Sequence, residues 1–240
     1  LSNKEFDYKI IGIPSHVYEK KLIIKERLNE KIKLSNSLEI GREIKFLTLI
    51  SRPEDNTWCN SIDRRAYLKT IGKYINNSKE WHLLIRAHPK ERGYEKKDWA
   101  KILGMNEHSK YLSITEKMPL ELAAISELAF SFVSDCCVDF ACFGKPMIEL
   151  TSKENSIFGL YTPFYNEDGY PVTALSSNNL SFNVNNVNQL EDLLNNLDYE
   201  IKNLSKKAKQ AYKNCYGQKS YEPGLFLKIL NEIKFKKNFS

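Results

Sequence analysis

The stretch LLIRAHPKE (Leu83–Glu91) decides how this chain is interpreted, because an apolar run ends there in a histidine, a proline and charged side chains. Residues 81–85 are bulky and apolar, which is typical of a buried strand. The proline cannot donate to a sheet and holds His88 in an extended conformation, so the strand ends at this histidine. Ligands of open parallel sheets bind outside the carboxyl ends of the strands. Arg86, His88 and Lys90 are therefore expected to meet an anion, the alternative for His88 being a hydrogen bond to a neighbouring loop.

Strand, polar loop and helix alternate on both sides of this stretch. Strands are expected at 44–50, 81–87, 111–114, 128–133 and 146–150, and helices at 61–76, 95–103, 119–126 and 134–143. This alternation predicts βαβ units, and hence an α/β, Rossmann-like fold with a parallel sheet flanked by helices. The segment 151–188 is expected to be loop-rich with a strand at 172–175, and helices at 190–197, 199–216 and 222–236 to close the chain.

The length of 240 residues suits one large domain, or one domain with a fragment of another. Residues 42–240 are expected to form the Rossmann-like domain. Residues 1–41 are expected to supply a strand, a helix and a polar linker at 35–42, either left from an N-terminal domain or added to complete a solitary one.

Composition excludes several classes of protein. No apolar run approaches the roughly 18 residues of a membrane-spanning helix, so a soluble, cytoplasmic protein is expected. The net charge of +6 suits an anionic small ligand and peripheral contact with the inner face of an anionic cell membrane equally well, and a solvated face of lysines accounts for it better than either. No nucleic acid is expected, because no module combines basic and aromatic residues for that purpose. The five cysteines lack CxxC spacing, which favours neither zinc nor disulfides.

Polar side chains follow three of the expected strands, beginning at Arg52, His88 and Ser134. In a doubly wound sheet these strand ends converge. Ser134 precedes an expected helix, whose free N–H groups attract phosphate, although the serine could equally be a simple helix cap together with Asp135. No DxD triplet occurs, so no metal is expected.

Three motifs together carry a resemblance to a known family: RAHPKE (86–91), a helix start at Pro119, and FSFVSDCCVDFACFGKPMIEL (130–150). Over about residues 44–150 the chain resembles the C-terminal nucleotide-binding domain of GT-B glycosyltransferases that build bacterial surface polysaccharides. The most similar groups are capsule and lipopolysaccharide transferases that use CMP-activated Kdo or sialic acid, and the related CDP-glycerol glycerophosphotransferases. The resemblance implies a nucleotide-activated donor, a glycan or glycolipid acceptor, and no redox or other cofactor.

The resemblance also implies roles for individual residues. His88 would be catalytic, binding the nucleotide phosphate and stabilising the leaving group, Ser134 would contact that phosphate, and Glu149 would bind the ribose hydroxyls. Alternatively, Glu149 is a surface carboxylate at a strand end. The family usually has two adjacent serines, whereas Asp135 follows Ser134 here, and its charge suits a phosphate site only if it points away as a helix cap. The predicted nucleotide-binding set is Arg52, Arg86, His88, Lys90, Ser134, Asp135 and Glu149.

Two other functions fit the same pattern. A non-catalytic nucleotide-binding or scaffold module would keep the fold without turnover. A UDP-sugar epimerase has a similar fold, but the carboxylates characteristic of such enzymes are not evident in this sequence. The leading hypothesis is therefore the donor-binding half of a glycosyltransferase.

Overall fold

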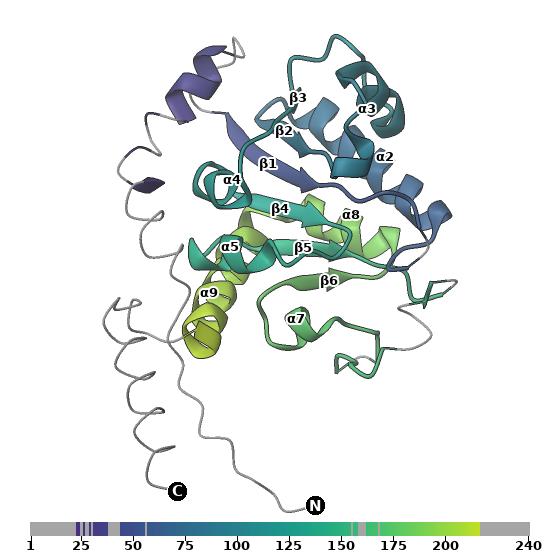
Figure 1. Ribbon diagram of the computed structural model, residues 1–240. Coiled ribbons are helices and arrows are strands. Elements are labelled where there is room, and N and C mark those ends of the chain that lie inside the picture. Colours follow the sequence, from purple (N-terminus) through teal and green to yellow (C-terminus); the bar gives the residue numbers. More distant parts are fainter. Residues whose placement is uncertain are drawn as a thin grey trace, which may run out of the picture.

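The protein contains one parallel sheet with helices on both faces. The computed structural model describes residues 23–24, 26, 29, 31–37, 44–55, 57–154, 156–157, 162–167 and 169–216. Within them the strands are β1 (Lys45–Ile50), β2 (Trp81–Arg86), β3 (Leu112–Ile114), β4 (Leu128–Ser131), β5 (Met147–Leu150) and β6 (Phe182–Val184). They lie in the order β3-β2-β1-β4-β5-β6, every neighbouring pair is parallel, and their carboxyl ends point the same way (Figure 1). The expected Rossmann-like fold is confirmed.

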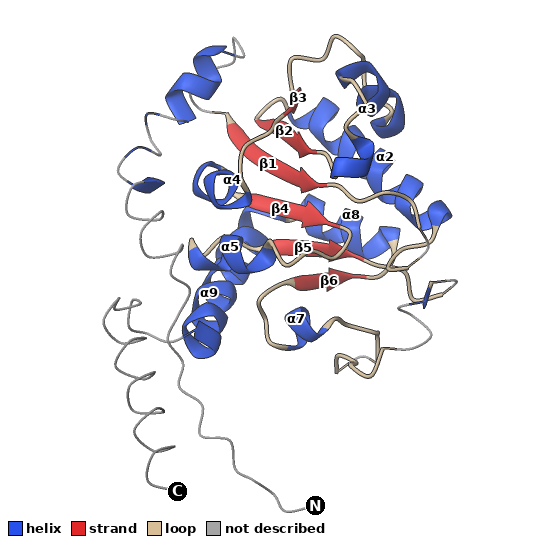
Figure 2. Ribbon diagram, viewed as in Figure 1, coloured by secondary structure: helices blue, strands red, loops and turns tan. Residues whose placement is uncertain are grey.

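Helices cover both faces of the sheet because strands such as β1 alternate their apolar residues between two cores. One core joins Leu47 and Leu49 of β1 to helices on one face, and the other joins Phe46 to helices on the opposite face. Figure 2 shows this layering. The first face carries α2 (Ser61–Ser78), α3 (Lys96–Leu103) and α8 (Val187–Asn195), and the second carries α4 (Pro119–Ile125) and α5 (Cys137–Cys142).

Helix α9 (Leu197–Tyr216) contributes to both cores and lies near the amino ends of the strands (Figure 1). Its first half places Leu197 and Leu204 in the core of α2 and α8. Its second half places Ala208 and Ala211 in the core of α4 and α5. The helix therefore passes from one face of the sheet to the other at this edge.

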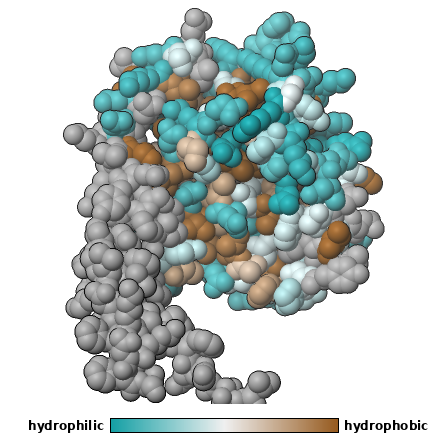
Figure 3. Space-filling model, in the orientation of Figure 1, coloured by the Kyte–Doolittle hydropathy of each residue, from teal (hydrophilic) through white to brown (hydrophobic). Residues whose placement is uncertain are grey.

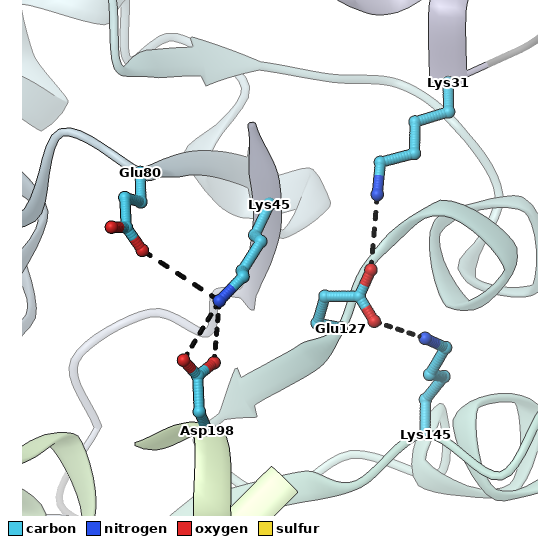
Figure 4. A network of polar contacts seen from close by, with 6 residues as sticks. All are labelled: Lys31, Lys45, Glu80, Glu127, Lys145 and Asp198. Carbon is cyan, nitrogen blue, oxygen red and sulfur yellow. Dashed lines mark hydrogen bonds and ion pairs between the residues drawn. The ribbon is translucent and has the colours of Figure 1, made fainter. Parts of the chain in front are cut away.

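Ion pairs add to the closure of the amino edge. Lys45, the first residue of β1, bonds both carboxylate oxygens of Asp198 at 2.8 and 3.0 Å. Glu127, just before β4, accepts from Lys145 at 2.6 Å and from Lys31 at 3.3 Å (Figure 4). Burial acts to raise the pKa of Glu127, but the two ammonium groups outweigh it and hold that pKa below its ordinary value.

Two sequence predictions about elements are wrong. The strand expected at 172–175 is a loop that leads into the short helix α7 (Ala174–Ser177), with Thr173 as its cap. The edge strand is β6 instead, three residues long and half exposed, which is too short to give a periodic signal. Residues 31–37 are helical, although a linker was expected from 35 onwards. The helix expected at 222–236 lies outside the described residues.

Candidate functional site

The three polar strand ends lie side by side at one edge of the sheet. Arg52 follows β1, His88 follows β2 and Ser134 follows β4, and β1 lies between the other two strands. The connections run from β1 to β2 and β3 on one side and from β4 to β5 and β6 on the other, so the strand order reverses between β1 and β4. Ligands of doubly wound sheets bind at such a switch point, at the carboxyl edge.

One ring nitrogen of His88 is engaged in a hydrogen bond within the protein. Its Nδ1 accepts the backbone N–H of Lys90 at 3.2 Å, in the short 3₁₀ helix η1 (Pro89–Glu91). Its own backbone N–H donates to Glu91 Oε2 at 3.1 Å. Because Nδ1 is an acceptor, the neutral ring carries its proton on Nε2, which is thereby fixed as the donor.

Arg64, which sequence reasoning missed, connects the loops of all three strand ends. Its Nη2 donates to the backbone carbonyl of Arg52 at 2.9 Å and to Glu91 Oε1 at 3.1 Å. Its guanidinium carbon lies 5.1 Å from the centre of the Phe132 ring, in the loop after β4. The side chain is buried on α2, and an Arg-Arg pair in a helix gives no sequence signal of burial. Through Glu91 it fixes the turn that carries His88.

The loop after β4 is strained just before Ser134. Val133 has a φ of 64°, which is a genuine outlier for a β-branched residue. Ser134 Oγ accepts the N–H of Cys136 at 3.3 Å, in the turn before α5. The expected cap formed by Ser134 and Asp135 is therefore wrong in detail, because α5 begins at Cys137 and its cap position is Cys136. Asp135 is exposed. Strain of this kind concentrates at ligand sites, where the surrounding structure maintains it.

The other three basic residues of the predicted site, Arg52, Arg86 and Lys90, do not share a common contact. Arg52 Nε lies 3.5 Å from Asp55, and its guanidinium lies 5.9 Å from the centre of the Trp58 ring. Arg86 Nε donates to the carbonyl of Lys117 at 3.1 Å, in the loop after β3. The exposed side chain of Lys90 lines a groove between α2 and α3.

Glu149 is fully buried, so the alternative that it is a surface carboxylate is wrong. It lies on β5 opposite Ser131 of β4, and its Oε2 accepts the hydroxyl of Thr173 at 2.6 Å. Glu149 Oε1 and Ser131 Oγ are buried without a hydrogen-bond partner among the described residues. Burial raises the pKa of Glu149 to about 7, against hydrogen bonds that act in the other direction.

The cysteines near the site are structural. Cys137 is buried and Cys136 is half-buried, and none of the five cysteines forms a disulfide bond. Burial raises the pKa of both thiols, which disfavours the nucleophilic thiolate. Across the described part of the chain, no group of three or more His, Cys, Asp or Glu residues is placed to hold a metal ion.

Comparison with solved structures identifies the fold. No protein-family model and no curated protein sequence matches the chain. The wall teichoic acid polymerase TagF matches with a TM-score of 0.56 and 14% identity, over 95% of this chain and 52% of that one. MnaA of S. aureus, solved with UDP, matches with a TM-score of 0.57 and 16% identity, over 96% of this chain and 55% of that one. A putative UDP-N-acetylglucosamine 2-epimerase from Listeria monocytogenes matches with a TM-score of 0.52 and 14% identity, over 87% of this chain and 48% of that one.

The chain has the fold of one half of a GT-B enzyme. It spans about half the length of the solved chains that it matches. Among the residues that the structure describes, no helix is long and apolar enough to cross a bilayer.

Proposed function

We propose that this chain is the donor-binding part of a glycosyltransferase of bacterial capsule or lipopolysaccharide synthesis, which uses a CMP- or CDP-activated donor. The observation that carries the proposal is the hydrogen bond from the Lys90 N–H to His88 Nδ1. This bond leaves Nε2 as the donor of the neutral ring, and in the proposal that donor meets the ligand at the carboxyl edge, beside the switch point. The cytidine preference draws on the sequence resemblance and on TagF, a variant of which was soaked with CDPG.

In the proposed reaction His88 binds the phosphate of the donor. A donor hydrogen bond to a phosphate oxygen stabilises the negative charge that develops when the sugar leaves. Arg52 and Arg86 flank this edge, and to meet the phosphate each has to leave its present partner, which is Asp55 for Arg52 and the Lys117 carbonyl for Arg86. The hydroxyl of Ser134 offers a further contact. Arg64 acts indirectly, because its ion pair with Glu91 holds the η1 turn.

Glu149 is proposed to bind the ribose hydroxyls, with one structural condition. Its carboxylate is closed off from solvent, and Thr173 bonds one of its oxygens. Ribose binding therefore requires the segment that carries Thr173 to move. The acceptor and the general base are assigned to no residue of this chain.

The test is calorimetric titration of CMP, CDP, UDP and ADP into the wild type and into His88→Ala. We expect the cytidine nucleotides to bind most tightly and the substitution to weaken them about tenfold to a hundredfold, because a hydrogen bond to a charged group contributes roughly 1.5–3 kcal/mol. The melting temperature should change little, because a half-buried loop residue contributes about 1 kcal/mol to stability.

The matched control is His108→Ala, whose exposed histidine lies in the loop between α3 and β3. It should bind nucleotides as the wild type does. If His88→Ala binds nucleotides like the wild type, the phosphate role of His88 is wrong. If the four nucleotides bind equally, the cytidine preference is wrong.

The second candidate is a UDP-sugar epimerase. The likeness to the putative UDP-N-acetylglucosamine 2-epimerase and to MnaA with UDP supports it at the level of fold. Such an enzyme would convert UDP-N-acetylglucosamine into its 2-epimer without an acceptor, which NMR of the sugar protons detects. Conversion, together with a preference for UDP over CDP, would replace the transferase proposal.

A further inference from the structure

A groove of about 780 Å³ lies between α2 and α3 at the carboxyl edge of the sheet. Its volume is within the roughly 300–1,000 Å³ of typical ligand sites. The two helices pack closely, since a Cβ on Gly72 of α2 would come within 2.0 Å of the carbonyl oxygen of Leu103 on α3. The lining residues come from α2, from α3 and from the loops after β1 and β2, and they include Arg64, Arg65, Lys69, Lys90, Tyr94 and Lys101.

The groove carries an excess of positive charge. Five cationic side chains and three carboxylates line it. Each carboxylate is already engaged. Glu54 lies 3.5 Å from Arg65 and Glu91 lies 3.1 Å from Arg64. Asp98 accepts the N–H of Glu95 at 2.9 Å, which caps α3.

Three cations remain without a counter-ion. Lys69, Lys90 and Lys101 form no ion pair with any residue that the structure describes, and all three are exposed. They project from three different elements, α2, η1 and α3, around one cavity. Such an arrangement attracts an anion more strongly than lysines scattered over a surface. In Figure 3 hydrophilic residues gather over the upper part of the molecule, where Figure 1 places α3.

The groove also contains an aromatic surface and a buried cation. Tyr94 is 47% exposed, and its ring meets the edge of the fully buried Trp99 with centres 5.8 Å apart. This contact holds a flat, amphipathic ring at the wall, of the kind that packs against a sugar. Arg64 is 7% exposed, and its Nε has no hydrogen-bond partner among the described residues. This arginine is paired with Glu91 and supports the wall of the groove.

We propose that this groove binds an anionic saccharide whose carboxylate or phosphate groups meet Lys69, Lys90 and Lys101, while a sugar ring packs on Tyr94. The groove shares the η1 turn with His88, because Lys90 lines it and bonds His88 through its backbone. Its use as a subsite for the growing acceptor chain rests on the proposed transferase function. The binding of anionic saccharides does not rest on that function.

The test compares two double variants of the whole chain. K69E/K101E reverses two charges inside the groove. K73E/K97E makes the same change on the same two helices, at exposed lysines that do not line it. The probes, titrated by calorimetry, are a trimer of galacturonic acid, a glycerol phosphate oligomer and neutral maltotriose. CDP is titrated into every variant as well, so that failure of the donor site is seen separately.

We expect one or both anionic probes to bind the wild type and K73E/K97E, and to bind K69E/K101E at least tenfold more weakly. The trimer and the phosphate oligomer distinguish a carboxylate ligand from a phosphate ligand. Binding should weaken several-fold towards 1 M salt, where the Debye length is about 3 Å. Tyr94→Ala should weaken binding of the galacturonic acid trimer more than binding of the glycerol phosphate oligomer, which has no sugar ring to pack on the tyrosine. The proposal is overturned if the wild type binds neither anionic probe, if maltotriose binds as well as they do, or if both double variants lose binding equally.

Discussion

Two carboxylates at opposite edges of the sheet have opposite surroundings. Glu127, at the amino edge, is bonded by two lysines, and these hold its pKa below the ordinary value against the effect of burial. Glu149, near the carboxyl edge, is fully buried, accepts the hydroxyl of Thr173 and faces no cation at contact distance among the described residues. Its burial raises its pKa to about 7.

The difference suggests that the amino edge of the sheet serves the stability of the fold and that the carboxyl edge serves ligand binding. The amino edge is covered by α9 and closed by ion pairs that match Lys45 with Asp198 and Glu127 with Lys145 and Lys31 (Figure 4). Among the residues that the structure describes, one carboxylate oxygen of Glu149 and the hydroxyl of Ser131 have no hydrogen-bond partner, and Val133 at the same edge is strained. Buried polar groups without partners lower stability. Their concentration at the edge of the switch point is the physical argument for a ligand site there.

Glu149→Gln tests the contrast with the largest expected effect. A carboxyl whose pKa is raised from 4.5 to about 7 stabilises the folded state below pH 4.5, and this contribution is lost as the pH rises through 7. The loss amounts to about 3 kcal/mol, at 1.36 kcal/mol for each pKa unit. Because glutamine stays neutral, the variant should be more stable than the wild type at pH 8, by up to that amount, and similar at pH 5. Urea unfolding at the two pH values measures this.

Glu127→Gln should do the reverse at the other edge. It leaves Lys145 and Lys31 without their counter-ion, which should cost about 2 kcal/mol at pH 7. Because the pKa of Glu127 is lowered, its contribution is present above pH 4.5 and is lost as the pH falls below it. The difference from the wild type should therefore shrink at pH 3. Glu116→Gln, at an exposed site, is the control and should change stability little. Parallel pH profiles for the Glu149 and Glu127 variants would remove the contrast between the edges.

Val133→Gly tests the strain at the carboxyl edge and should change stability the least of the three substitutions. The left-handed conformation costs an L-residue about 1–2 kcal/mol, and glycine gives back about 0.5–1 kcal/mol through its greater freedom when unfolded. The variant should therefore be more stable by up to about 1 kcal/mol, while CDP binds more weakly because the Ser134 loop is less constrained. Asn179→Gly, also at positive φ, is the control, since asparagine tolerates this conformation. Thermal melts and CDP titration report both quantities, and a destabilised Val133→Gly would show that the loop is not strained.

The sequence by itself determined the parallel sheet, most of its strands and the three strand ends that carry Arg52, His88 and Ser134. These follow from local signals, because apolar runs, prolines and polar strand ends repeat over short distances. Strand β6 was not predicted, because three residues are too few to show the alternation of apolar and polar side chains that is typical of a strand. The tertiary structure alone decided that Arg64 and Glu149 are buried and that Lys90 faces the groove with Lys69 and Lys101. Burial and charge pairing depend on residues far apart in the chain, such as Glu149 with Thr173 or Arg64 with Glu91, and no local pattern encodes them.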